Sequence, residues 1–149
     1  MATIHIITVG KIKDSHIQAL EQDYLKRLTS LKIQLHELKA HREDREKEGK
    51  EVLKKLDELS PCFPITLEEK GQQMASPELS EWLMGKVSQG EKPVLILGGA
   101  SGHGEEVLKR SKFSLSLGKL TYPHQLARLI LVEQIYRTHC IHQGHPYHK

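Results

Sequence analysis

A buried strand that runs directly into a glycine loop constrains the fold of this chain more than any other feature. The apolar run at 93–97, Pro-Val-Leu-Ile-Leu, is followed at once by Gly-Gly-Ala-Ser-Gly at 98–102. A continuous apolar run is typical of a parallel strand that is covered on both faces. Glycines directly after such a strand allow bare backbone to approach a ligand. These two segments predict an α/β fold with a binding site in the last third of the chain.

Strand and helix patterns alternate along the whole sequence. Strands are predicted at 4–9, 32–38, 63–67, 94–97 and 113–117. Between them, apolar residues recur at spacings of three and four, as on one face of a helix. The predicted helical faces are Ile17, Leu20, Tyr24 and Leu28; Val52, Leu53, Leu56 and Leu59; and Leu79, Trp82, Leu83 and Val87. Ser76 is the expected N-cap of the third helix, with Pro77 at its first position. This order predicts an open, mainly parallel sheet with helices on both faces.

Length and composition indicate an ordinary globular protein. A chain of 149 residues is expected to form a single domain over 1–149. No apolar run approaches the ~20 residues that cross a bilayer, and the first ten residues are typical of a strand and not of a signal peptide. Two cysteines, Cys62 and Cys140, are too few for a disulfide framework. We therefore expect a cytoplasmic protein without a membrane partner.

The charge pattern permits a nucleic-acid partner without requiring one. The formal net charge is +3, whereas dedicated nucleic-acid binders usually concentrate more positive charge. The densest charge lies at 39–55, where both signs are mixed. Such a run is typical of a solvated surface.

The last predicted helix is apolar around nearly its whole circumference. Its apolar residues are Leu126, Ala127, Leu129, Ile130, Leu131, Val132, Ile135 and Tyr136. A helix of this kind needs cover on more than one side. A two-fold partner subunit would provide it, which predicts a homodimer. The alternative is a central core helix in a monomer.

Several local patterns do not match common cofactor or metal motifs. The glycines at 98–102 lack the first, third and sixth spacing of a dinucleotide loop. Gly118-Lys119 is not the end of a P-loop, because Phe113 and Leu120 occupy positions that need glycine and a hydroxyl residue. The histidines within 139–148 match no standard zinc spacing, so we expect no metal.

The terminal pair Tyr147-His148 suggests contact with RNA. Terminal residues normally fray, but an aromatic ring and an imidazole can stack on an unpaired base or hydrogen-bond to it.

Five segments resemble the RlmH family of SPOUT-class methyltransferases. They are Leu-Gly-Gly-Ala-Ser-Gly at 97–102, Leu-Ser at 115–116, Lys-Leu-Thr-Tyr-Pro-His-Gln at 119–125, Glu-Gln-Ile-Tyr-Arg at 133–137 and Tyr-His-Lys at 147–149. The segments 7–11 and 67–71 fit the same pattern, so the resemblance runs from end to end. Tyr122 stands where a more apolar residue is common, and His103-Gly104 is individual to this chain.

The resemblance implies a C-terminal trefoil knot, which is an exception to the rule against knotted chains. It also implies a homodimer that binds S-adenosylmethionine (SAM) against the knot, without a metal. Carried over by position, the cofactor contacts would be Leu67, Gly98, Leu117, Gly118, Lys119, Leu120, Thr121 and Tyr122.

The reaction that the resemblance implies is methylation of N3 of a pseudouridine in 23S rRNA of the bacterial large ribosomal subunit. Candidates for the base and for positioning are His148 and Tyr147, followed by His124. Candidates for phosphate contacts are Arg128, Arg137 and Lys149. Arg128 and Arg137 have a structural alternative, because Glu133 and Arg137 can pair at i,i+4.

Three other functions remain open at this point. One is methylation of another RNA, such as tRNA, by an enzyme of the same fold. Another is a non-catalytic role in ribosome binding or assembly. The remote option is a zinc-dependent hydrolase.

Overall fold

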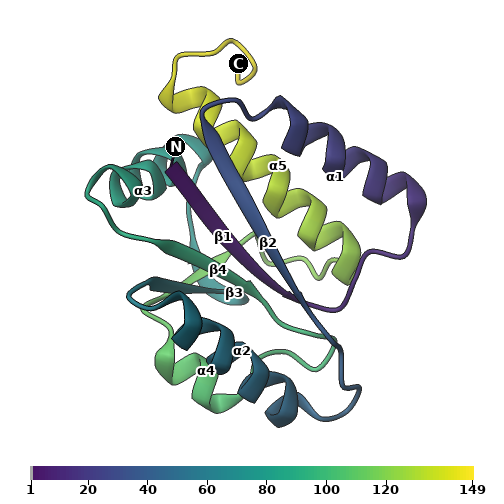
Figure 1. The fold of residues 1–149 in the computed structure, drawn as a ribbon. Helices are drawn as coiled ribbons and strands as arrows, with labels where there is room; N and C mark the ends of the chain where they lie inside the picture. The colour runs from purple at the N-terminus through teal and green to yellow at the C-terminus, as the bar shows by residue number, and fades with distance from the viewer. Residues whose placement is uncertain (1) are drawn as a thin grey trace.

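A five-stranded parallel sheet forms the centre of the protein (Figure 1). The computed structural model describes residues 2–149. The strands are β1 (Ala2–Val9), β2 (Leu31–Leu38), β3 (Phe63–Gln73), β4 (Pro93–Leu97) and β5 (Phe113–Ser116), in the order β2-β1-β4-β3-β5. Every neighbouring pair is parallel. The predicted α/β sheet is confirmed, and it is parallel throughout.

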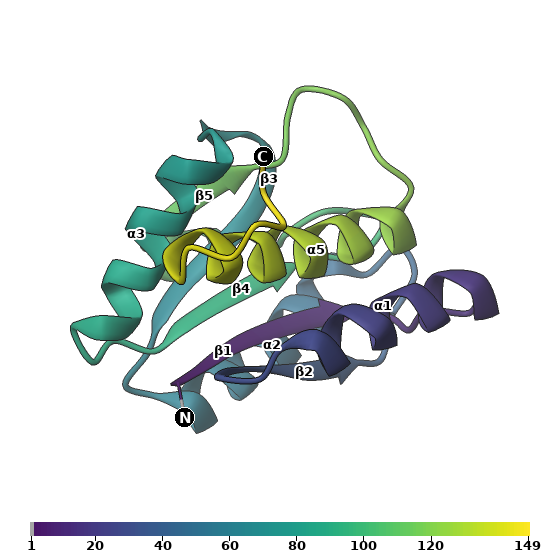
Figure 2. The same cartoon turned by 90° about the horizontal axis from the view of Figure 1, so that it is seen from above.

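Helices cover both faces of the sheet, as the sequence predicts (Figures 1 and 2). One face carries α1 (Ser15–Arg27), α3 (Ser76–Ser88) and α5 (His124–His142), with α5 between the other two. The opposite face carries α2 (Arg45–Leu59) and the short α4 (Glu105–Arg110). Side chains alternate between the two sides of a strand, so each central strand contributes to two separate cores.

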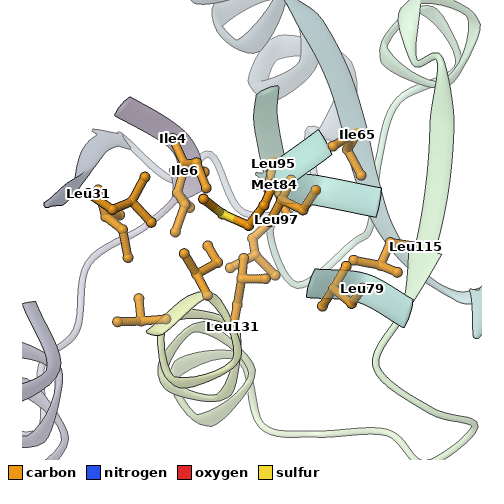
Figure 3. Packing of buried hydrophobic residues seen from close by; sticks show 14 residues of the cluster. Ile4, Ile6, Leu31, Ile65, Leu79, Met84, Leu95, Leu97, Leu115 and Leu131 are labelled. Carbon is orange, nitrogen blue, oxygen red and sulfur yellow. The ribbon is translucent and has the colours of Figure 1, made fainter. Parts of the chain in front are cut away.

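Successive residues of the central strands belong to different hydrophobic cores, one on each face of the sheet. Ile4 and Ile6 of β1, with Leu95 of β4 and Leu115 of β5, face α3 and α5 and pack with Leu131 of α5 (Figure 3). A second set of strand residues packs on the other face with Val52 and Leu56 of α2 and with Val107 of α4. This set is Ile7, Val9, Val94 and Ile96. Because β4 is buried along its whole length, its continuous apolar sequence is explained by cover on both faces.

Some local expectations differ from the structure. Leu20, predicted on the buried face of α1, is 51% exposed; the predicted Tyr24 and Leu28 pack against the core, and Leu25 joins them in place of Leu20. Ala75, not Ser76, is the N-cap of α3; the Ser76 hydroxyl donates to the Gln134 side chain at 2.7 Å. The third strand continues to Gln73, beyond the predicted end, through a shift of register after Leu67.

Helix α5 is buried on its inner side and partly open elsewhere. Leu131, Val132 and Ile135 are fully buried in the core. Leu126, one of the apolar residues near its start, is 39% exposed, and Ile130 is half-buried. A single chain therefore leaves part of the apolar circumference uncovered.

The segment 117–123 leads from the edge strand β5 back across the sheet to α5 (Figure 2). This return path belongs to the region in which the trefoil knot is expected, and the knot stays a prediction. Within residues 2–149, no helix combines the length and apolar character needed to cross a membrane.

Candidate functional site

A pocket lies where β4 and β5 end and where β3 bends. Three adjoining hollows share Tyr122 as a wall, and we call them together the carboxyl-edge pocket. Their walls come from β3, the start of α3, the glycine loop 98–102, the segment 115–122 and the first half of α5. The largest hollow measures about 570 Å³, which is within the range of small-molecule sites. Carboxyl ends of parallel strands are the usual place for ligands in open α/β sheets.

A serine and a glycine shape the wall of the pocket after β5. Gly118 has a φ of +131°, a backbone conformation that other residues rarely adopt. Its N–H donates to the Ser116 hydroxyl at 3.0 Å, and that hydroxyl also contacts the Glu69 carbonyl at 3.0 Å. These bonds fix the turn against the bent part of β3.

The start of α5 is anchored to the loop before α1. The Gln125 side-chain oxygen accepts the N–H groups of Lys13 and Asp14, at 3.0 and 3.1 Å. One residue earlier, His124 lines the largest hollow. The anchor therefore fixes the helix end that closes the pocket.

Arg128 lies inside the protein, which corrects its assignment as a phosphate contact. It is 4% exposed, and its guanidinium donates to Glu21 at 2.8 and 2.9 Å and to Glu37 at 2.6 Å. Burial opposes the charge, but the bonds and charges of the two carboxylates raise the pKa of Arg128 above its ordinary value. The structural alternative holds for this residue, because its donors are used within the fold.

The pocket combines apolar surface with negative charge. Leu67, Leu97 and Leu117 supply apolar walls, and Glu68 and Glu69 lie beside them. The Glu68 carboxylate accepts the Ser114 hydroxyl at 2.5 Å, which orients it. Such a pocket suits a ligand that has both an apolar part and a positive charge.

Most of the predicted cofactor residues come together in this pocket. Those that line it are Leu67, Leu117, Gly118, Leu120, Thr121 and Tyr122. Gly98 lines a small neighbouring hollow behind the glycine loop. Lys119 is exposed and is not part of the walls. His124 is the one predicted catalytic candidate that lines the pocket in this chain.

The C-terminal tail packs against α5 and α1, outside the pocket. The Tyr147 hydroxyl donates to Glu133 at 2.9 Å, and its ring lies edge-on to Tyr136 with centroids 4.8 Å apart. His148 Nδ1 lies 3.1 Å from Arg137 Nη1. Neither Tyr147 nor His148 lines any of the three hollows. The structure thus brings these two candidates together, but away from the other site residues.

These contacts limit the proton chemistry of the packed tail. Burial, with hydrogen bonds to Tyr24 and Glu133, raises the pKa of Tyr147 well above its ordinary value, so the phenol stays neutral. Arginine only donates, so His148 Nδ1 accepts from Arg137. The lone pair of His148 Nδ1 is therefore engaged by Arg137 in this arrangement.

The two remaining phosphate candidates differ in their surroundings. Arg137 donates to Glu133 at 2.7 and 3.0 Å, and its guanidinium lies 4.8 Å from the Tyr147 ring centroid. The predicted i,i+4 pair is confirmed. Lys149 is exposed next to the tail residues.

Comparison with known proteins identifies the family. A family model described as "Predicted SPOUT methyltransferase" matches residues 2–148. The chain belongs to the SPOUT methyltransferase family. Its SPOUT relatives include proteins named ribosomal RNA large subunit methyltransferase H. The one from Carboxydothermus hydrogenoformans is 40% identical, with 98% of this chain and 99% of the relative covered. The one from Bacillus cytotoxicus is 37% identical over the same shares.

A solved structure has the same fold at low sequence identity. It is Nep1 of Archaeoglobus fulgidus, crystallised with S-adenosylhomocysteine, with a TM-score of 0.51 and 12% identity. The match covers 97% of this chain and all of the other. This likeness shows the fold alone.

Several wall residues of this SPOUT pocket were not among the sequence-based candidates, and four of them bear on its chemistry or shape. They are Glu68, Glu69, His103 and Gln134. The glutamates follow a predicted strand directly, and that position at the carboxyl edge of a parallel sheet is a usable signal. His103 and Gln134 reach the pocket through tertiary packing and leave no such signal. Within residues 2–149, the structure brings together no group of three or more His, Cys, Asp or Glu side chains able to hold a metal.

Proposed function

We propose that this protein is a SAM-dependent methyltransferase that modifies N3 of a pseudouridine in 23S rRNA of the large ribosomal subunit. It acts in the cytoplasm as a homodimer. The observation that carries the proposal is the carboxyl-edge pocket, formed on a SPOUT fold by six of the eight residues expected to bind the cofactor. The names of the relatives support rRNA as the substrate.

The pocket has the chemistry that SAM requires. Leu67, Leu97 and Leu117 offer an apolar slot for an adenine ring. The backbone around Gly118 can approach the ring edge, because the glycine has no side chain to hold it away. Glu68 and Glu69 provide negative charge near a ligand that carries a positive sulfonium.

The protein's part in the reaction is alignment and proton removal. When bound, SAM supplies an electrophilic methyl group. N3 of pseudouridine carries a proton that would have to leave as the nitrogen bonds to the methyl carbon, while the sulfur–methyl bond breaks and S-adenosylhomocysteine is released. Alignment contributes about 7–11 kcal/mol in favourable cases, and a positioned base adds about 10²–10⁴-fold in rate. His124 lines the pocket, and His148 is the leading candidate for the base.

The tail acts across the dimer in this proposal. In a single chain, Tyr147 and His148 pack on α5 outside the pocket. We assign them to the partner's pocket, where His148 would be released from Arg137 when RNA phosphates compete for that guanidinium. Arg137 and Lys149 then contact the RNA backbone.

The partly uncovered side of α5 supports the dimer. Leu126 is 39% exposed, and Leu120, in the segment before α5, is 72% exposed. A two-fold partner would cover these apolar side chains. Sedimentation at micromolar concentration is expected to show a dimer; a monomer alone would contradict this part of the proposal.

Transfer of a labelled methyl group tests the activity and the RNA class together. The protein is incubated with methyl-labelled SAM and, separately, with ribosomes that lack the modification, with their large subunits, and with tRNA. Label in large-subunit rRNA is the expected result. Label in tRNA alone would instead favour the other RNA methyltransferase. SAM binding without any transfer would favour the non-catalytic role.

A further inference from the structure

The glycine loop 98–102 is a tight turn that forms one wall of the carboxyl-edge pocket. The Gly102 N–H donates to the Gly99 carbonyl at 3.0 Å, which closes the loop on itself. Gly99, Ala100 and Gly102 line the largest hollow, opposite Leu67 and Glu68. The shape of this loop therefore sets the width of the pocket on that side.

Glu48 supports the loop from the side of α2. This carboxylate is 5% exposed, although it belongs to the charged segment expected to be solvated. Its Oε2 accepts the His41 N–H at 2.7 Å. A methyl group added at Gly99 would lie 2.7 Å from Oε1 and 3.0 Å from Oε2. The carboxylate thus lies close to Gly99, and a side chain at position 99 would force the carboxylate or the loop to shift.

His103 connects the other end of the loop to β3. Its Nε2 lies 3.0 Å from the Leu67 carbonyl oxygen. A carbonyl only accepts, so Nε2 carries the proton and donates. Its Nδ1 lies 3.1 Å from the position that a methyl group on Gly98 would take. His103 lines both the largest hollow and the small hollow behind the loop.

We propose that Glu48 and His103 are positioning residues that hold the glycine loop in its cofactor-binding shape. The inference rests on the proposed function for the identity of the cofactor. Glu48 limits movement of the loop towards α2, and His103 fixes its distance from Leu67, a wall residue on the facing strand. Together they preorganise the backbone before the ligand binds, which improves affinity because less order is lost on binding.

Single replacements of His103 distinguish a role in positioning the loop from a role in the stability of the fold alone. His103→Leu removes the donor but keeps a side chain of similar bulk, and His103→Gln restores a donor near the position of Nε2. We measure the affinity for S-adenosylhomocysteine by calorimetry, the KM for SAM and kcat, with thermal unfolding as a check of folding. His16→Leu is the matched control, because the His16 side chain is 93% exposed and far from the loop in sequence.

A double-mutant cycle tests the contact between Glu48 and Gly99. Gly99→Ala should weaken S-adenosylhomocysteine binding in the wild-type background, because the added methyl group meets the carboxylate. In the Glu48→Ala background the same change should cost much less, because the space is open. Equal losses in both backgrounds would show that the contact does not position the loop.

The expected result for His103→Leu is a rise of about three- to tenfold in the KM for SAM and in the dissociation constant of S-adenosylhomocysteine, with kcat nearly unchanged. His103→Gln should recover most of the affinity. Wild-type affinity for S-adenosylhomocysteine in His103→Leu, or no recovery of that affinity in a folded His103→Gln, would overturn this inference and leave the proposed function standing. Absence of S-adenosylhomocysteine binding by the wild-type protein would instead overturn the proposed function.

Discussion

The Arg128 guanidinium donates two hydrogen bonds to the Glu21 carboxylate, at 2.8 and 2.9 Å, across 107 positions of the chain. Both side chains are buried, and Glu37 completes the cluster. This contact joins α1 to α5 one turn after His124, so it holds the helix that closes the carboxyl-edge pocket.

Removal of the Arg128 charge should strongly destabilise the fold. Arg128→Met leaves two carboxylates without their buried partner, and breaking such a pair from one side costs about 3–5 kcal/mol. The free energy of unfolding is measured by urea denaturation. Arg27→Met is the control: Arg27 pairs with Asp23 at the surface, where such pairs contribute about 0.2–1 kcal/mol. Equal losses in the two variants would contradict the structural role of Arg128.

The protein should lose stability as the pH falls from 6.5 towards 4. Burial, followed by the charges of His36, Lys92 and Lys32, lowers the pKa of His5 from 6.5 to about 4. Between these values the unfolded chain binds a proton that the folded protein rejects, so the free energy of unfolding decreases with falling pH.

Replacement of His5 isolates this contribution from other titrating groups. His5 Nδ1 lies 3.0 Å from His36 Nε2, so His5→Gln keeps a polar partner for His36 but takes up no proton. The loss of stability between pH 6.5 and about 4 should therefore be smaller in the variant. An identical loss in the wild-type protein and the variant would show that His5 does not titrate in this range.

Gly118 should matter for the cofactor and not only for folding. Its φ of +131° makes Gly118→Ala cost about 1–3 kcal/mol, and the strain lies in the pocket wall. Gly90→Ala is the matched control, since Gly90 has a φ of +82° and lies at the end of α3, before β4. We expect both variants to be less stable, but only Gly118→Ala to bind S-adenosylhomocysteine more weakly. Equal binding by the two variants would count against the assigned site.

The C-terminal tail should affect turnover without affecting the cofactor. His148 and Tyr147 do not line the pocket of their own chain. His148→Ala should therefore lose most of its methyl transfer and keep its affinity for S-adenosylhomocysteine. Wild-type turnover in this variant would eliminate His148 as the base. Mixing His148→Ala with Gly118→Ala chains should restore some activity if the tail acts across the dimer.

Local patterns predicted the sheet well because its strands obey short-range rules. β4 is apolar at every position, as a strand covered on both faces must be. The same rules failed for Leu20, since a periodicity of three and four does not show which side of α1 meets α5. Six wall residues of the pocket were expected from the family resemblance; five of them lie in the segment after β5, and the sixth, Leu67, lies in β3.

Tertiary contacts account for what the sequence could not show. Glu48 lies in a charged segment that local rules place at the surface, yet it is buried against Gly99, 51 positions later. Arg128 was expected to meet phosphate, but its partners come from α1 and β2. Charge patterns predict the burial of neither Glu48 nor Arg128, because that burial depends on elements far away in the chain.

The most direct test of the central claim is to map the labelled methyl group after incubation with SAM and unmodified ribosomes. Nuclease digestion and mass spectrometry assign the modified nucleotide and the modified atom. We predict methylation at N3 of a pseudouridine in 23S rRNA, and Gly118→Ala should reduce it in proportion to the loss of cofactor binding. A methyl group on a different nucleotide, or no transfer by protein that binds S-adenosylhomocysteine, would contradict the account.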